Sequence, residues 1–125
     1  MSGAILLCGS FPGLPPTVNH LYRTWGKAKR TKTKAAREWQ NVTARMFADW
    51  KHNGASYEGD VAVRIRFTTP DKRKWDLDNR LKALLDTLQM AEVIKNDSQI
   101  KFLLAERKKG SNDGISSTFI TVRAL

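Results

Sequence analysis

The sequence predicts a single α+β domain with the element order β-α-β-α-β-β, in which two helices pack on one small mixed or antiparallel sheet. Three observations predict it. Two segments carry apolar residues at helical spacing, a third alternates strictly, and the chain ends in two strand-like segments joined by a turn. With 125 residues, 41% of them hydrophobic, the chain can bury one compact core, so residues 1–125 are expected to form one domain.

The first half of the chain is expected to hold one strand and one helix. The apolar run AILLC, residues 4–8, predicts a strand that the turn-forming segment SFPGLPP ends. The single cysteine, Cys8, lies in this run and is expected to be buried in the core. Residues 21–37 then predict a basic loop. From residue 33 to residue 51, apolar and aromatic side chains recur at helical spacing, which predicts an amphipathic helix.

The second half is expected to add three strands and a helix. Residues 60–69, DVAVRIRFTT, alternate in a way that predicts a half-buried strand with a basic outer face. Leucines at positions i, i+3, i+4 and i+7 predict a helix over residues 78–90 that packs on the sheet. Residues 100–106 and 115–124 read as two strands, and the Gly, Asn and Asp residues between them predict a hairpin connection.

The chain carries a large excess of positive charge. Its 22 lysines and arginines against 12 acids give a net charge of +10, which makes a polyanion such as DNA the first partner to consider. No apolar stretch approaches the roughly 20 residues that span a bilayer, so a soluble protein without membrane contact is expected. The two histidines lack the spacing of a zinc site.

The cations expected to contact DNA lie in the basic loop, on the outer face of the alternating strand and just before residue 76. They are Arg23, Lys27, Lys29, Arg30, Lys32, Lys34, Arg64, Arg66, Arg73 and Lys74. Aromatic residues interleaved with the loop cations would allow base stacking beside backbone contact. A solvated surface loop explains the same cations equally well.

Residues 71–80, DKRKWDLDNR, place two carboxylates among many cations. In an extended segment Asp76 and Asp78 share one face and are expected to converge. Asp97 is expected to return beside the start of the helix, and clustered carboxylates suit a hard cation such as Mg²⁺. A structural explanation competes, because Asp78 stands where a helix N-cap is expected.

The stretch DLDNRLKALLDTLQMAEVIKND, residues 76–97, resembles the signature of the RusA family of Holliday junction resolvases. That signature pairs Asp-x-Asp-Asn with a downstream lysine and a later aspartate. PPTVNHLY, residues 15–22, is similar to the family's Pro-Pro-x-x-Asn segment, and the resemblance extends over essentially the whole chain. Where the family often has Asp-Asp, this chain has Asn96 and Asp97, and we align the essential acid with Asp97.

The resemblance implies a RusA-like fold and a function in DNA recombination and repair. The implied protein is a cytoplasmic homodimer, encoded by a bacterium or a phage, that binds four-way DNA junctions and makes paired symmetric nicks. The resemblance also implies that Mg²⁺ is the cofactor, that Mn²⁺ can replace it, and that no small-molecule cofactor is used. The implied catalytic residues are Asp76, Asp78 and Asp97, which bind the metal, and Lys82, which stabilises the phosphate or orients water. Asn79 and Asp86 also match the signature, and for them supporting or capping roles stand beside catalytic ones. Asn96 is expected to be a supporting position.

Two other functions fit the same residues. A basic DNA-binding module without catalysis would use the aspartates only to cap a helix and balance nearby cations. A related nuclease that prefers forks or flaps would use the same metal site on another branched DNA.

Overall fold

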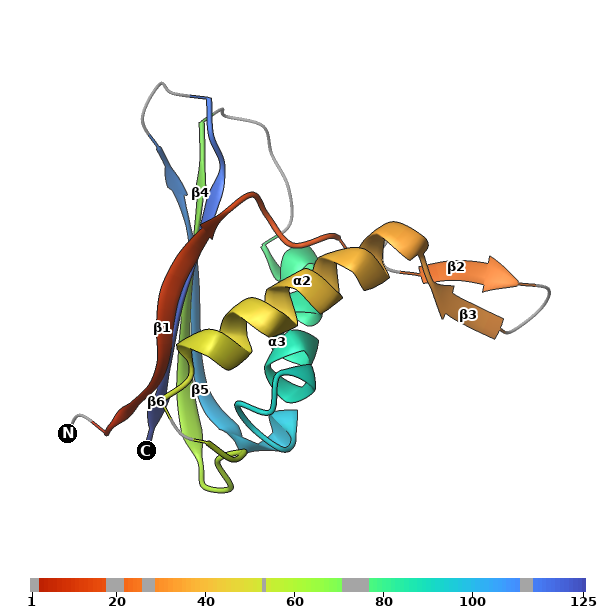
Figure 1. The fold of residues 1–125 in the computed structure, drawn as a ribbon. Helices are drawn as coiled ribbons and strands as arrows, with labels where there is room; N and C mark the ends of the chain where they lie inside the picture. The colour runs from red at the N-terminus through yellow and green to blue at the C-terminus, as the bar shows by residue number, and fades with distance from the viewer. Residues whose placement is uncertain (1–2, 18–21, 26–28, 53, 71–76, 111–113) are drawn as a thin grey trace.

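One layer of the molecule is a four-stranded mixed sheet, and the other is a pair of helices that cover one face of this sheet (Figure 1). The computed structural model describes residues 3–17, 22–25, 29–52, 54–70, 77–110 and 114–125. In chain order, the elements are β1 (Ile5–Pro12), β2 (Tyr22–Trp25), β3 (Lys29–Lys32), α2 (Lys34–Trp50), β4 (Val61–Thr69), the 3₁₀ helix η1 (Asp78–Arg80), α3 (Leu81–Met90), the 3₁₀ helix η2 (Asp97–Gln99), β5 (Ile100–Lys109) and β6 (Ser117–Ala124).

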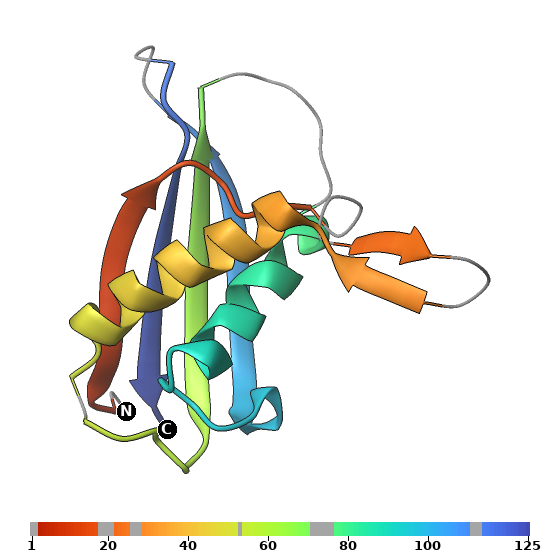
Figure 2. The ribbon, with the colours of Figure 1, turned by 45° about the vertical axis from the view of Figure 1, so that its right-hand side comes forward.

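The strands of the sheet lie in the order β1-β6-β4-β5. β6 is antiparallel to both of its neighbours, whereas β4 and β5 are parallel. Parallel neighbours need a crossover connection, and α3 supplies it by carrying the chain back along the sheet (Figure 2). The expected α+β fold with two helices on one mixed sheet is confirmed.

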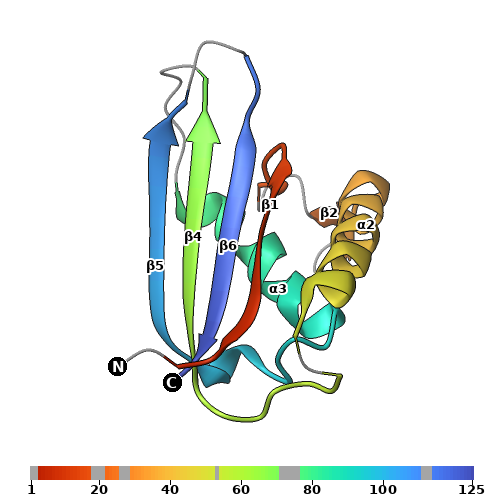
Figure 3. The ribbon, with the colours of Figure 1, turned by 60° about the vertical axis from the view of Figure 1, so that its left-hand side comes forward.

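The predicted hairpin between the last two strands is wrong, because β4 lies between β5 and β6 (Figure 3). β6 takes a central place, where Ile120 and Val122 are fully buried, while β5 lies at the edge. Turn-forming residues between two strands predict that the chain reverses there. They do not predict that the two strands are hydrogen-bonded to each other.

The core forms where the alternating strand meets the two helices. Val63, Ile65 and Phe67 of β4 are fully buried, as the alternation predicted. On α3, Leu84 and Leu88 are also fully buried, which confirms the leucine stripe. β4, α2 and α3 begin and end within a few residues of the predicted positions. Their hydrophobic patterns repeat within the element itself, so they can be read from the local sequence.

The helix α2 has a defined start and an aromatic inner face. The hydroxyl of Thr33 accepts a hydrogen bond of 3.1 Å from the Ala36 N–H, so Thr33 is the N-cap. Phe47 and Trp50 pack against each other with ring centroids 5.9 Å apart. Gly9 of β1 lies under Trp50, and a Cβ at this position would be 2.6 Å from the indole ring. β1 can therefore approach α2 closely only because residue 9 has no side chain.

Cys8 is exposed, contrary to the expectation of a buried core residue. The pairing of β1 with β6 shifts register between Ile5 and Leu7, and this irregularity lets both Leu6 and Leu7 face the core. Alternation then turns Cys8 to the outer face, where its Sγ accepts a hydrogen bond of 3.8 Å from the Thr121 hydroxyl.

The basic segment predicted as a loop is a β-hairpin. β2 and β3 pair in antiparallel orientation, with Tyr22 opposite Lys32 and Trp25 opposite Lys29, and the hairpin extends away from the sheet beside the start of α2 (Figures 1 and 2). Threonine, tyrosine and tryptophan favour extended backbone, which allows this basic segment to pair with itself.

Over the part of the chain that the structure describes, none of the helices combines the length and the apolar character needed to cross a bilayer.

Candidate active site

Asp78 opens the short helix η1 directly before α3, and its side chain is exposed. The N-cap residues of η1 and α3 are Leu77 and Arg80, and neither makes a side-chain capping bond. The expected N-cap role of Asp78 is therefore wrong. Its carboxylate lies in the first turn, where the free N–H groups of the helix favour negative charge. The expected convergence with Asp76 falls outside the described residues.

Lys82 lies one helical turn after Asp78, on the exposed side of α3. Its ammonium nitrogen is 3.5 Å from a carboxylate oxygen of Asp86, and the side chain of Lys82 is 47% exposed. This i,i+4 pair holds a cation beside Asp78 while leaving it accessible to a ligand from solvent. The polar stripe that the sequence predicted on this helix is present, and Asp86 serves in it as a partner of Lys82.

Arg80 joins the acidic segment to the N-terminal segment. Its Nη1 donates a hydrogen bond of 2.7 Å to the backbone carbonyl of Pro15. Burial lowers the pKa of the Arg80 guanidinium, and the group still keeps its charge at neutral pH. The two segments that carried the family resemblance are thus in direct contact through Arg80. The sequence analysis missed this role, although Arg80 directly follows the Asp-x-Asp-Asn motif.

Asp97 opens η2, which follows the end of α3, whereas Asp78 opens η1, which precedes the start of α3. The backbone N–H of Asp97 donates a 2.7 Å hydrogen bond to the side-chain carbonyl of Gln89, near the helix C-terminus. Because α3 has ten residues, its two ends are about 15 Å apart. The expectation that Asp97 returns beside the start of the helix is therefore wrong.

The topology explains this separation. β4 and β5 are parallel, so α3 must return the chain to the end of the sheet where β4 began. β5 then starts at that end, and η2, which precedes it, packs against the end of α3. Asn96 caps η2, since its side-chain oxygen accepts a hydrogen bond of 2.8 Å from the Ser98 N–H. The sequence did not predict this capping role of Asn96.

The described carboxylate at the start of α3 is a ligand of the kind that a hard cation prefers, but it forms only part of a metal site. Within the ranges that the structure describes, no three side chains of His, Cys, Asp or Glu gather closely enough to hold a metal ion. Asp78 contributes one exposed carboxylate, and Asp86 lies a further two turns along α3 with Lys82 as its partner. Carboxylate oxygens are the ligands that Mg²⁺ prefers. The second expected ligand at this end, Asp76, lies outside the described residues.

Two of the predicted DNA-binding cations are paired with an acid on the sheet. Arg64 and Arg66 lie on the outer face of the sheet, on the side opposite to α3, and both pair with Glu106. The Nε of Arg66 is 2.8 Å from the Glu106 carboxylate, and this contact lowers the pKa of Glu106. These two arginines, which were expected to contact DNA, are therefore separated from Asp78 by the sheet.

The remaining cations lie mainly at the hairpin. The backbone of Arg23, Lys29 and Arg30 belongs to β2 and β3, while Lys27, Arg73 and Lys74 lie outside the described residues. Lys32 instead bonds within the protein: its Nζ donates a hydrogen bond of 2.6 Å to the buried side chain of Gln40. Lys34 is exposed in the first turn of α2.

The fold and the acidic start of its crossover helix define the class of protein. The family model described as Endodeoxyribonuclease RusA matches residues 12–123, nearly the whole chain, so the chain belongs to the RusA endodeoxyribonuclease family. Among curated proteins, the chain is similar to the crossover junction endodeoxyribonuclease RusA of Aquifex aeolicus (strain VF5), with 43% identity over 47 residues. The matched segment covers 38% of this chain and 37% of that relative.

Proposed function

We propose that this protein is an endodeoxyribonuclease that resolves four-way DNA junctions in recombination and repair. The observation that carries the proposal is the family match over residues 12–123, which includes the exposed Asp78 and Lys82 at the start of α3. The net charge of +10 supports DNA as the partner. The Aquifex relative is named for activity on crossover junctions.

The aspartate carboxylates at the start of α3 suit Mg²⁺ as the bound cation, and Mn²⁺ is expected to substitute for it. Asp78 would hold it together with Asp76. When bound, the cation supplies Lewis-acid polarisation of the phosphate and an activated water. Lys82 is placed to bind a phosphate oxygen and stabilise its negative charge, and Asp86 positions the Lys82 ammonium through the 3.5 Å contact. Asn79 adjoins Asp78 and supports this segment.

The protein acts as a homodimer in this proposal. A four-way junction has approximate twofold symmetry, so a twofold dimer presents two equivalent sites to two equivalent strands. Paired, symmetric nicks follow from that match. Each chain has one helix α3 and therefore contributes one Asp78 and one Lys82 to the dimer.

The test is cleavage of a labelled synthetic four-way junction, beside a fork and a linear duplex, in Mg²⁺ or in EDTA. The variants are Asp78→Asn and, as a matched control, Asp49→Asn, which makes the same change at an exposed position of α2. We expect Mg²⁺-dependent paired nicks in the junction, lost in Asp78→Asn and retained in Asp49→Asn, with junction binding retained in both.

Two other results would replace the proposal. Tight junction binding without cleavage in any divalent metal would identify a DNA-binding module. Faster cleavage of the fork than of the junction would identify a related nuclease with another branched substrate.

A further inference from the structure

The backbone of the segment that carries Asp97 is held by two glutamine side chains. The N–H of Asp97 donates its 2.7 Å hydrogen bond to the side chain of Gln89 on α3. The N–H groups of the two preceding residues, Lys95 and Asn96, donate hydrogen bonds of 2.8 Å and 2.9 Å to the side-chain oxygen of Gln99. Three consecutive backbone donors therefore end on Gln89 and Gln99.

The side-chain amide of Gln99 uses its full hydrogen-bonding capacity. A primary amide has two acceptor positions on its oxygen and two donor hydrogens on its nitrogen. The oxygen accepts the two bonds just described, and Nε2 donates to the backbone carbonyls of Tyr57 and Gly59, at 2.7 Å and 2.8 Å. These carbonyls belong to the segment before β4. Gln99 thus joins that segment to the one that carries Asp97.

The segment before β4 is itself fixed against buried residues. Tyr57 forms an isolated parallel bridge with Ile94, and its N–H donates a hydrogen bond of 3.1 Å to the carbonyl of Val93. The side chains of Val93 and Ile94 are fully buried in the core. Gln99 therefore connects the backbone around Asp97 to a part of the chain that the core holds in place.

The carboxylate of Asp97 takes no part in these bonds. Asp97 is exposed, and within the ranges that the structure describes no hydrogen bond or ion pair holds its carboxylate. By comparison, the carboxylates of Glu58, Asp86 and Glu106 each pair with a lysine or an arginine. A fixed backbone with an available carboxylate is what a metal ligand needs, because supporting hydrogen bonds must hold the ligand in position before the cation arrives.

We infer that Gln89 and Gln99 are positioning residues for Asp97 in the nuclease reaction, because they fix its backbone and leave its carboxylate free to bind. The inference rests on the proposed function and on the metal-binding role that the family resemblance implies for Asp97. Neither glutamine contacts the cation or the phosphate, and each acts only through Asp97. The inference holds whichever site of the homodimer Asp97 serves.

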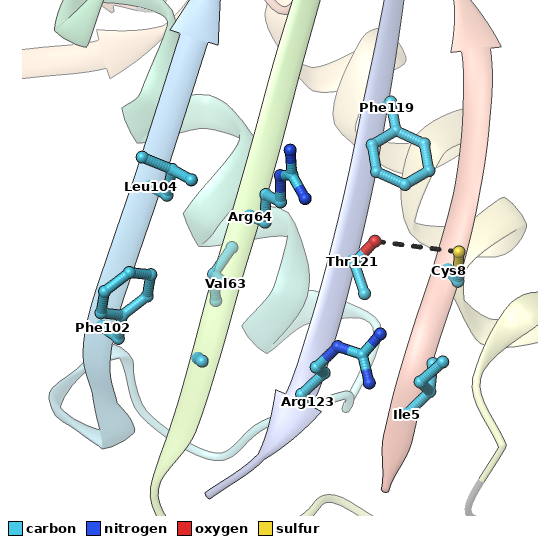
Figure 4. A pocket seen from close by; sticks show the side chains of 10 residues that line it. Ile5, Cys8, Val63, Arg64, Phe102, Leu104, Phe119, Thr121 and Arg123 are labelled. Atoms are coloured by element: carbon cyan, nitrogen blue, oxygen red, sulfur yellow. Dashed lines mark hydrogen bonds between the residues drawn. The ribbon is translucent and has the colours of Figure 1, made fainter. Parts of the chain in front are cut away.

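The first experiment separates the hydrogen bond to Asp97 from general stability. Gln89→Met keeps the length of the side chain and removes the acceptor, while Gln89→Glu keeps an acceptor oxygen. Thr121→Val is the matched control, since it removes one side-chain hydrogen bond, of 3.8 Å to the Sγ of Cys8, on the outer face of the sheet (Figure 4).

The measured quantities are the cleavage rate at saturating junction and Mg²⁺, and the junction affinity in EDTA. We expect the rate to fall roughly tenfold or more in Gln89→Met, the usual loss when a supporting partner of a ligand is removed. The rate should recover in Gln89→Glu and stay unchanged in Thr121→Val. The junction affinity should be the same in all three variants, because Gln89 does not contact DNA.

The second experiment follows the backbone of Asp97 by nitrogen-15 relaxation, without DNA or metal. Gln99→Glu keeps the side-chain oxygen but replaces both donors to Tyr57 and Gly59 with a carboxylate oxygen. In this variant and in Gln89→Met, we expect the order parameter of the Asp97 amide to fall from the rigid value of about 0.85 toward about 0.6. The order parameters of β4 should stay unchanged, which would show that the fold persists.

Three results would overturn the inference: a rigid Asp97 amide in both variants, full cleavage by both variants, or an equal loss of cleavage in Gln89→Met and Gln89→Glu. Failure of the wild type to cleave the junction in any divalent metal would instead overturn the proposed function. The inference would fall with it, because a positioned Asp97 would then have no reaction to serve.

Discussion

At the scale of single residues, Asp78 is an exposed carboxylate that is the N-cap of neither η1 nor α3. It lies in the first turn before α3, and the N-cap residues Leu77 and Arg80 make no side-chain capping bonds. A residue with this placement contributes little to the fold. Stability and activity should therefore respond differently when it is replaced.

Asp78→Asn should abolish junction cleavage and change the free energy of unfolding by less than about 1 kcal/mol, the usual size of a charge effect at a helix start. Urea denaturation, with Asp49→Asn measured in parallel, checks the stability and the junction assay checks the activity. A loss of about 2 kcal/mol or more would restore the capping explanation.

Replacing Arg80, unlike replacing Asp78, should lower the free energy of unfolding. Its hydrogen bond of 2.7 Å to Pro15 holds the segment before α3 against the N-terminal segment. Replacing Arg80 with methionine keeps most of the apolar stem and removes this bond, so we expect a loss of about 1–3 kcal/mol in the free energy of unfolding. Lys82→Met is the matched control, since Lys82 is exposed and should affect cleavage alone. Equal stability of the two variants would show that Arg80 does not anchor the segment.

At the scale of elements, local patterns predicted local structure. The alternation over residues 60–69 and the stripe over residues 78–90 give β4 and α3 because each pattern repeats within the element itself. Strand neighbours are set by contacts between distant segments. The sequence therefore predicted β5 and β6 but not the insertion of β4 between them.

The same limit of local patterns explains which parts of the candidate site could be predicted from the sequence. Asp78 and Lys82 were predicted on one side of a helix, because four residues of separation determine that relation within any helix. The position of Asp97 depends on β5 being parallel to β4, which no local pattern encodes. The contact of Arg80 with Pro15 joins residues 65 positions apart and was likewise invisible in the sequence.

The packing of β1 on α2 gives a prediction for these two elements. A Cβ at Gly9 would lie 2.6 Å from the Trp50 ring, which is wedged against Phe11 and Phe47. Gly9→Ala should therefore lower the free energy of unfolding by about 1–3 kcal/mol, the usual cost of overpacking. Ser10→Ala, at the next and exposed position of β1, is the control for the same strand. Thermal unfolding of the two variants measures the difference, and a neutral Gly9→Ala would mean that Trp50 moves freely.

At the scale of the whole molecule, the separation of Asp78 from Asp97 bears on the proposed homodimer. One chain places these carboxylates at opposite ends of α3, about 15 Å apart, which is too far for one shared metal ion. β5 begins at the end of the sheet where α3 ends and runs back toward the end where α3 starts. The proposed homodimer contains a second Asp97, so the two carboxylates of one site need not come from the same chain.

A mixed dimer tests whether one site uses both chains. If Asp97 serves the site of the other subunit, a dimer of one Asp78→Asn chain and one Asp97→Asn chain has one intact site and one doubly defective site. We expect this mixed dimer, purified through two different affinity tags, to nick one strand of the junction, while each homodimeric variant is inactive. A mixed dimer of wild type and Asp78→Asn keeps one site under either arrangement and calibrates the assay. An inactive Asp78→Asn/Asp97→Asn dimer beside an active calibration dimer would place both carboxylates in one chain, and α3 and η2 would then have to rearrange when the junction binds.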